Sequence, residues 1–307
     1  MSNTSRSNAK NSNRKLSDRP GQKRRPQRRS FRRSGYIATG LVLTVLAVLI
    51  VVRVTSGSSP TTGGSADSTN GTTVLSSATT HSVTHVPTST LDGVSPSSSL
   101  AGPQAITGSP TLLTQNGKPS VLYMGAEYCP FCAAERWPLV VALSRFGTFT
   151  GLKGTHSSSS DSYPNTPTLS FLGSTYSSAY LTFTSVEMQS NELVDGAYPT
   201  LQSPTAAEQA TLTKYDVSPY TTNPGSIPFI DFGNRYVQIG ASYDPGVLAG
   251  QTDEGIADEL TGDSATATSI DGTANLLTAA ICKVTGNTPK SVCTDSVVTL
   301  AARALAG

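Results

Sequence analysis

The sequence contains few charged residues, few histidines and few cysteines, and these shortages limit the chemistry it can carry. Charged residues account for 14% of the 307 residues, and there are three histidines and four cysteines. Only one histidine, His156, lies beyond residue 100. We find no Ser-His-Asp order, no paired-carboxylate motif and no nucleotide-binding glycine loop. The sequence therefore gives no basis for a hydrolase, and the cysteines become the main candidates for chemistry.

Negative charge is almost absent from the N-terminus and dominates the rest of the chain. The first 34 residues contain twelve Lys or Arg and a single acid, Asp18. From Thr55 onward nine Lys or Arg stand against nineteen Asp or Glu, which leaves a formal net charge of −10. An acidic region rich in Ser, Thr and Gly suits a surface outside the cell, and it argues against a nucleic-acid partner.

One uncharged segment is long enough to cross a membrane. Residues 36–52 carry no charge over 17 positions, which corresponds to about 25 Å of helix. The basic flank predicts that residues 1–35 stay in the cytoplasm and that everything after Arg53 is exported. We therefore predict a signal anchor over residues 36–54 that spans the cell membrane once. A cleavable signal peptide is the rival interpretation, but no small-x-small cleavage site follows the apolar segment.

The basic residues beside this segment have an ordinary explanation. The run Lys23–Arg29 is of a kind that can bind nucleic acid. Positive charge next to a membrane span also sets the topology and is attracted to anionic lipid. We favour the second explanation and expect no nucleic-acid partner.

Residues 55–104 are dominated by Ser, Thr, Gly and Pro and contain little that can form a core. This composition predicts a solvated, flexible linker. His81 and His85 lie in it, but no Cys or carboxylate cluster accompanies them, so we do not expect a metal site there. The folded extracytoplasmic domain is expected to comprise residues 105–307.

Two cysteines separated by two residues, Cys129 and Cys132, carry the most information. They follow an apolar stretch at 121–124, and residues 131–146 after them have helical spacing. At a strand-to-helix junction the first sulfur lies near the unpaired amides of the helix N-terminus, where a thiolate is favoured. Thiol–disulfide exchange requires this geometry, although a bare C-x-x-C also resembles half of a zinc site.

A second motif follows about a hundred residues later. The sequence GSIPFIDF at 225–232 predicts a bend, an Ile-Pro bond and a short apolar strand, and a second strand-like run ends in Gly240. Together with the C-x-x-C, this arrangement resembles the thioredoxin superfamily, whose members place a cis-proline opposite the two thiols. Pro228 and Gly240 match the proline and the glycine of that pattern. The segment GAEYCPFCAAERW at 125–137 is more narrowly similar to DUF929, an uncharacterised family of archaea and actinobacteria.

The resemblance implies roles for several residues. It implies that the Ile227–Pro228 bond is cis, that Pro228 keeps the thiols from binding metal, and that a substrate strand pairs beside Ile227. It further implies that Cys129 forms a mixed disulfide with the substrate and that Cys132 resolves it. One departure is Tyr123, which occupies the position of a buried acid that helps to move protons in thioredoxins.

Side chains next to the thiols are candidates for substrate contact. Tyr128 and Phe131 flank the cysteines and are predicted to line a groove for an apolar peptide, although packing against the proline loop is an alternative. Glu127 and Glu135 are the nearest acids in sequence. Both are candidates for assisting proton transfer, but we expect them to be solvated at the surface.

The predicted elements alternate in an order typical of a thioredoxin-like α/β fold, with a mixed sheet and helices on both faces. The long segment between the thiols and the proline implies insertions into that fold, and Ser203 is the expected N-cap of the second helix. We predict strands over 120–126, 179–188, 229–232 and 235–239, helices over 131–146, 204–215 and within 245–260, and a surface loop at 156–162.

Two further cysteines, Cys282 and Cys293, flank a strong turn signal at 286–289 in a C-terminal extension that is expected to be helical. Outside the cytoplasm, such a pair is most simply a structural disulfide. A relay that passes electrons to Cys129 is the alternative. A four-cysteine zinc site is less favoured because the second pair lacks C-x-x-C spacing.

These observations predict a membrane-anchored, extracytoplasmic thiol–disulfide oxidoreductase. It would act on exported protein thiols or disulfides and exchange electrons with a membrane redox partner. We expect it to need no cofactor and no metal. Two alternatives stay open: a redox-inactive thioredoxin-like binding module, and a copper-handling protein with His156 as a third ligand.

Overall fold

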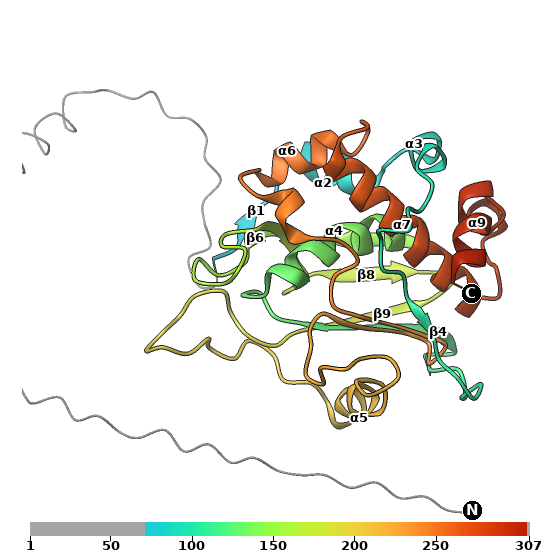
Figure 1. Cartoon of the computed structure of the whole chain (residues 1–307), viewed down its shortest axis with the longest axis horizontal. Helices are drawn as coiled ribbons and strands as arrows, with labels where there is room; N and C mark the ends of the chain where they lie inside the picture. Colours follow the sequence, from blue (N-terminus) through green and yellow to red (C-terminus); the bar gives the residue numbers. More distant parts are fainter. Residues whose placement is uncertain (1–70, 306–307) are drawn as a thin grey trace, which may run out of the picture. The chain divides into compact units, whose positions relative to one another are not determined.

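The computed structural model describes residues 71–305, and these form a mixed α/β structure (Figure 1). The basic tail, the predicted anchor at 36–54 and the first part of the predicted linker lie outside the described residues. None of the helices between residues 71 and 305 has the length and apolar character that a bilayer crossing needs. The α/β class predicted from the sequence is confirmed for this part of the chain.

A mixed sheet organises the structure around one central strand. Its strands are β2 (Gln104–Ala105), β3 (Thr114–Gln115), β4 (Lys118–Gly125), β9 (Thr182–Glu187), β10 (Phe229–Phe232) and β11 (Tyr236–Ile239). The central strand β4 pairs antiparallel with β10 on one edge and parallel with β9 on the other. β10 pairs in turn with β11. Met124, near the C-terminal end of β4, lies opposite Phe229 at the start of β10. The cysteine motif and the proline loop therefore meet where these two neighbouring strands end and begin.

Both faces of β4 are buried, because its side chains alternate between two apolar cores. Val121 and Tyr123 belong to the larger core, and Leu122 and Met124 belong to the smaller one. A strand covered on both faces is held firmly, and it fixes the direction in which the chain leaves toward the cysteines.

Helices cover both faces of this sheet. They include α4 (Pro130–Ser144), α5 (Ala206–Tyr215), the 3-10 turn η1 (Pro245–Leu248), α6 (Asp253–Glu259) and α7 (Ala265–Val284). α4 and α7 lie on the side of the larger core, and α5 lies on the opposite side (Figure 1). Trp137 of α4 is fully buried, and its indole N–H donates to the Pro167 carbonyl at 3.1 Å.

The start of α5 differs from the sequence-based prediction. Thr205, rather than Ser203, is the N-cap, and the helix begins at Ala206. The Thr205 hydroxyl accepts a hydrogen bond from the Glu208 N–H at 3.3 Å, and the Glu208 carboxylate accepts one from the Thr205 N–H at 2.6 Å. This reciprocal pair satisfies two amides that the first helical turn would otherwise leave free, which favours the later start.

The insertion between α4 and β9 contains four strands that the sequence did not predict. They are β5 (Gly147–Thr150), β6 (Lys153–His156), β7 (Pro167–Ser170) and β8 (Thr175–Ser178), and they pair antiparallel as β5 with β8 and β6 with β7. The loop expected at 156–162 follows β6, but Ser157 and Ser158 are buried. The Ser157 hydroxyl donates to the Tyr163 carbonyl at 2.8 Å and accepts from the Thr166 N–H at 2.9 Å, which folds this loop back on itself.

Residues 71–104 contradict the prediction of a flexible linker in that range. They form β1 (Thr73–Val74), which pairs with β6, and the helices α2 (Ser77–Thr84) and α3 (Thr88–Gly93). Leu75, Val83 and Leu91 are buried in the larger core. Asn275 of α7 donates to the Leu91 carbonyl at 2.9 Å. Three buried apolar side chains are enough to hold this segment in the folded domain, because a helix cap and side-chain hydrogen bonds pair the polar groups of its backbone.

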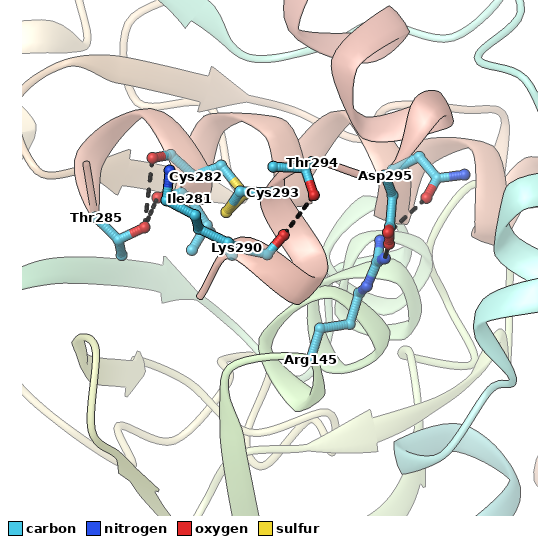
Figure 2. Close-up of a disulfide and its surroundings, with 9 residues drawn as sticks. Arg145, Ile281, Cys282, Thr285, Lys290, Cys293, Thr294 and Asp295 are labelled. Carbon is cyan, nitrogen blue, oxygen red and sulfur yellow. Dashed lines mark hydrogen bonds and ion pairs between the residues drawn. A yellow bond between two sulfur atoms is a disulfide. The ribbon is translucent and has the colours of Figure 1, made fainter. Parts of the chain in front are cut away.

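The C-terminal extension is helical and is closed by a disulfide (Figure 2). α7 is followed by α8 (Lys290–Cys293) and α9 (Ser296–Ala304). Cys282 and Cys293 are bonded, with 5.6 Å between their Cα atoms. Nearby, Arg145 at the end of α4 forms an ion pair with Asp295 at 2.6 Å, which attaches the extension to the helix that carries the cysteine motif.

Candidate functional site

Cys129 is the N-cap of α4, between the end of β4 and the first helical turn. Pro130 occupies the first helical position, where a missing backbone N–H costs nothing. The Cys129 sulfur accepts a hydrogen bond from the Cys132 N–H at 3.3 Å and lies 3.7 Å from the Ile227 carbonyl oxygen. Cys129 is 5% exposed and Cys132 is fully buried, and both are free thiols.

The two thiols differ in acidity. A hydrogen bond from the Cys132 thiol lowers the pKa of Cys129, and the amides of the first turn and the charge of Arg136 also lower it, whereas burial opposes them. Burial raises the pKa of Cys132 well above its usual value, and its interactions with Cys129 raise it further. The pair therefore favours a Cys129 thiolate beside a Cys132 thiol.

The loop before β10 lies against Cys129 through Ile227. The Ile227–Pro228 bond is cis. The Pro228 carbonyl accepts a hydrogen bond from the Gly240 N–H at 2.8 Å, which ties the loop to the end of β11. Gly240 has a φ of 79°, in the left-handed region that glycine adopts without strain.

A buried ionic cluster lies behind the thiols and includes an acid that we expected to be solvated. Arg136, one turn after Cys132, donates from Nε and Nη2 to the Glu187 carboxylate at 2.9 and 2.7 Å. Its Nη2 also donates to the Ala126 carbonyl at 3.0 Å and lies 3.7 Å from Glu127 Oε2. The side chains of Arg136, Glu127 and Glu187 are fully buried. The surface prediction for Glu127 was wrong, because Arg136 supplies the positive charge that permits its burial.

The two acids of this cluster are not equivalent. Glu187 receives both charged hydrogen bonds from Arg136. Glu127 accepts one hydrogen bond, from the Ser170 hydroxyl, and its other oxygen, Oε2, has no hydrogen-bond partner. Burial raises the pKa of Glu127 to about 7, with Arg136 opposing the rise and Glu187 adding to it. Glu127 therefore changes protonation near neutral pH while it is buried.

Tyr123 adds a buried hydroxyl without a partner to this cluster. The guanidinium carbon of Arg136 lies 5.9 Å from the centroid of the Tyr123 ring. The phenol lies over Gly125 and leaves no room there for a Cβ. Burial raises the pKa of Tyr123 well above its usual value, Arg136 opposes this rise, and Cys132 adds to it. Tyr123, Glu127 and Arg136 each have a buried polar atom without a hydrogen-bond partner. Of these three residues, Arg136 and Tyr123 interact electrostatically with Cys132.

Glu135, the second acid that we expected to be solvated, is also fully buried. Its carboxylate accepts hydrogen bonds from the backbone N–H of Ser242 at 2.8 Å and from the Ser242 hydroxyl at 3.0 Å. Burial raises the pKa of Glu135 to about 8, partly opposed by these hydrogen bonds. Its burial is compensated by Ser242, and the contact attaches α4 to the segment that follows β11.

Four aromatic residues, which we call the aromatic rim, pair beside the motif. Tyr128 stacks on Tyr198 with ring centroids 4.4 Å apart, and Phe131 meets Tyr163 edge-on at 5.9 Å. Ser158 joins the first pair to the loop after β6, because its N–H donates to the Tyr128 carbonyl at 2.9 Å and its hydroxyl accepts from the Tyr198 hydroxyl at 2.8 Å. The loop after β6, which contains Tyr163, and the segment between β9 and α5, which contains Tyr198, therefore supply the ring partners of the predicted substrate-binding residues Tyr128 and Phe131.

The histidines do not join the thiols. The Nδ1 atom of His156 lies 2.8 Å from the Ser157 carbonyl oxygen. His81 of α2 stacks on His85, the C-cap of that helix, with ring centroids 4.3 Å apart. Between residues 71 and 305, no group of three or more His, Cys, Asp or Glu side chains is placed to hold a metal ion. The copper-handling alternative, which needs a third ligand, gains no support from the described residues.

Sequence reasoning missed Arg136, Glu187, Tyr163 and Tyr198. A signal existed for Arg136, which lies four residues after Cys132 and so on the same face of a helix. No comparable signal marks Glu187, because only the pairing of β9 with β4 brings it near Arg136. The two tyrosines lie in irregular segments, where spacing says nothing about position.

Comparison with known proteins gives one result. The family model described as a domain of unknown function, DUF929, matches residues 104–283. This range contains both thiols, the ionic cluster and the aromatic rim, and it ends just after Cys282. Neither a curated protein nor a solved structure matches the chain.

Proposed function

The chain belongs to the DUF929 family, and we propose that this member is a membrane-anchored, extracytoplasmic thiol–disulfide oxidoreductase. An anchor at residues 36–54 holds it in the cell membrane, with the folded domain outside the cytoplasm. Its substrates are thiols or disulfides of exported proteins, and a membrane redox partner returns it to its starting state. The observation that carries the proposal is the place of the first sulfur: Cys129 caps the first turn of α4, accepts a hydrogen bond from the Cys132 N–H at 3.3 Å and lies 3.7 Å from the Ile227 carbonyl oxygen.

Unequal acidity suits a dithiol exchange site, since one sulfur must attack while the other stays protonated. Cys129, which has a lowered pKa and is the less deeply buried of the two thiols, is the attacking thiolate. Cys132 remains a thiol partly because a negative charge on Cys129 raises its pKa. That contribution disappears once Cys129 is bonded to a substrate, so Cys132 then loses its proton more readily.

Exchange in the reducing direction proceeds in two steps. The Cys129 thiolate attacks one sulfur of a substrate disulfide, a protein–substrate S–S bond forms, and the other substrate sulfur leaves as a thiolate. Cys132 then loses its proton and attacks the Cys129 sulfur, which forms the Cys129–Cys132 disulfide and releases the first substrate sulfur as a thiolate. Two electrons pass from the protein to the substrate, and oxidation of a substrate dithiol runs these steps in reverse.

The buried cluster supports a route for the Cys132 proton. The charge of Arg136 lowers the pKa of Cys132 and so assists its ionisation. Glu127, with a pKa of about 7 and an oxygen that has no hydrogen-bond partner, is suited to take the proton. In this scheme Glu127 performs the task of the strand acid whose position Tyr123 occupies.

A thioredoxin-like fold is part of the proposal. The element order β4-α4-β9-α5-β10-β11-α6 supports it, as does the mixed sheet with helices on both faces. The 3.7 Å distance between the Cys129 sulfur and the Ile227 carbonyl supports pairing of a substrate strand with this loop. Pro228, next in the chain, excludes metal from the thiols in this scheme.

Substitution of the resolving thiol tests the proposal. The full-length Cys132→Ser protein should accumulate a mixed disulfide with a peptide whose cysteine is part of a disulfide, because the Cys129 thiolate can displace one sulfur of that bond while the second step cannot occur. The adduct is detected by mass and should vanish on reduction. The matched Cys129→Ser protein should form none. An adduct through neither thiol, or equal amounts through both, would remove the basis of the assignment.

One observation favours a second function. Cys129 is only 5% exposed and Cys132 is fully buried, which also suits a static disulfide in a redox-inactive binding module. Such a module would show no turnover with thiol substrates, and it would keep its partners when both cysteines are replaced by serine. Turnover by the wild-type protein separates the two functions.

A further inference from the structure

Four loop segments border the cysteine motif: 157–166, 189–205, 217–228 and 240–246. Hydrogen bonds attach the first two directly, since the Ser158 N–H donates to the Tyr128 carbonyl and the Glu127 N–H donates to the Gln189 carbonyl, both at 2.9 Å. The third contains Ile227, which contacts Cys129. The fourth contains Gly246, against which Tyr163 of the aromatic rim lies closely enough to restrict a Cβ there.

These segments contain acids but no Lys or Arg. The acids are Asp161, Glu192, Asp195 and Asp244, all exposed or half-buried. Two of them lie beside the aromatic rim. Burial raises the pKa of Tyr128, and the charges of the thiols and of Asp161 raise it further. The Asp244 carboxylate, hydrogen-bonded to the Tyr163 hydroxyl, raises the pKa of that phenol. A negative field therefore accompanies both aromatic pairs.

The motif and its bordering segments also expose apolar side chains. Among residues 71–305, six large apolar side chains are exposed, and four belong to the motif or these segments: Phe131, Leu193, Val194 and Val217. The segment between β9 and α5, which carries two of them, projects from the body of the domain (Figure 1). Exposed apolar groups among carboxylates suit a partner that is both apolar and positively charged.

We propose that the preferred substrates are extended protein segments in which a Lys or Arg lies next to the reacting cysteine. The inference rests on the proposed function and names its substrate class. A cation beside the substrate cysteine is attracted to the faces of the rim tyrosines and to Asp161. Apolar residues of the substrate next to that cation cover Phe131. A segment with acids beside its cysteine meets like charge from the carboxylates and from the Cys129 thiolate.

Peptides that differ in one residue test this preference. We choose three otherwise identical peptides with Lys, Gln or Glu next to a cysteine, each blocked as a disulfide with 2-mercaptoethanol. Reduction by the reduced full-length protein is measured in single turnover, and each rate is divided by the rate with dithiothreitol, an uncharged reductant. We expect the order Lys, Gln, Glu with about two- to fivefold between neighbours at low salt, and differences that shrink at high salt.

A matched pair of variants assigns the preference to this surface. Asp161→Asn keeps the oxygen that accepts from Ser162 but removes the charge, so the Lys-to-Glu ratio should fall at least twofold. Asp263→Asn, an exposed acid between α6 and α7, should leave the ratio unchanged. Equal normalised rates, a preference for Glu, or an unaltered ratio in Asp161→Asn would overturn the inference.

The failure of the proposed function gives a different result. Hydroxyethyl disulfide is small and uncharged, so its reduction by the wild-type protein reports exchange without reference to the surface. Reduction of this compound without any charge preference among the peptides would overturn the substrate class alone. Reduction of neither the compound nor the peptides would overturn the exchange activity, and the substrate class with it.

Discussion

Replacing the two acids that share Arg136 should have unequal effects on stability. Glu187→Gln removes the carboxylate that receives both hydrogen bonds from the guanidinium. Breaking a buried ion pair on one side costs about 3–5 kcal/mol. Glu127, whose Oε2 lies 3.7 Å from Arg136 Nη2, ionises in response and offsets part of the lost stability. A pKa of about 7 would make that ionisation cost about 1.4 kcal/mol at pH 6, and the cost is smaller in the variant because the Glu187 charge no longer raises the pKa of Glu127. We expect a net loss of about 2–3 kcal/mol.

Glu127→Gln should cost much less. Near pH 6 the side chain is mostly protonated, its Oε2 makes no hydrogen bond, and the amide oxygen of Gln still accepts from Ser170. The expected loss is below about 1 kcal/mol. Because the folded-state pKa of Glu127 is raised, its contribution is fully present below about pH 4.5 and is lost as the pH rises through 7. Glu127→Gln should therefore gain stability relative to wild type between pH 5 and 8, by up to about 3 kcal/mol.

The single tryptophan provides the assay. Trp137 is fully buried next to Arg136 on α4, so its fluorescence reports unfolding of the helix that carries the cluster. Urea unfolding of the full-length wild type and both variants at pH 6 and pH 8 gives the difference in unfolding free energy from wild type for each variant at each pH. A larger loss for Glu127→Gln than for Glu187→Gln at pH 6 would show that Glu127 is the charged partner, and the reasoning would fail.

Three further predictions concern other parts of the domain. Replacing both Cys282 and Cys293 by alanine should lower the unfolding free energy by about 3 kcal/mol, from the eleven-residue separation, without changing exchange rates; slower exchange would favour the relay. Glu135→Gln should reduce the loss of stability between pH 5 and 9 in urea titrations, since burial raises its pKa to about 8; an unchanged pH profile would contradict this. Gly125→Ala should lower the melting temperature by several degrees, because the Tyr123 phenol fills the space; an unchanged melting temperature would count against that packing.

The strand before the cysteines and the helix after them could be predicted because their apolar residues follow simple periods. The hairpin after Pro228 was predictable for the same reason, with its turn signal at 233–234. Local patterns predict each of these elements separately, and it was the resemblance to the thioredoxin superfamily that implied a proline loop beside the thiols, where β10 pairs with β4.

The ionic cluster could not be predicted, because it is buried by segments whose composition does not predict that they pack against the core. Glu127, just before α4, and Glu135, within it, have the character of surface acids when the sequence around the cysteines is considered alone. The helix is enclosed by β7, by α7 and by residues 71–104, whose composition predicted a linker. The pairing of β9 with β4 then supplies Glu187 from over fifty residues away. Long-range coverage, rather than local spacing, decides where these charges lie.

The most direct test of the exchange activity is the reduction potential of the Cys129–Cys132 pair in the full-length protein. Equilibration with glutathione, followed by thiol alkylation and mass analysis, measures it and reports separately on Cys282–Cys293. The proposed activity predicts a reversible couple between roughly −120 and −270 mV. A pair that stays oxidised well below about −300 mV would behave as a structural bond, and the oxidoreductase would give way to the binding module.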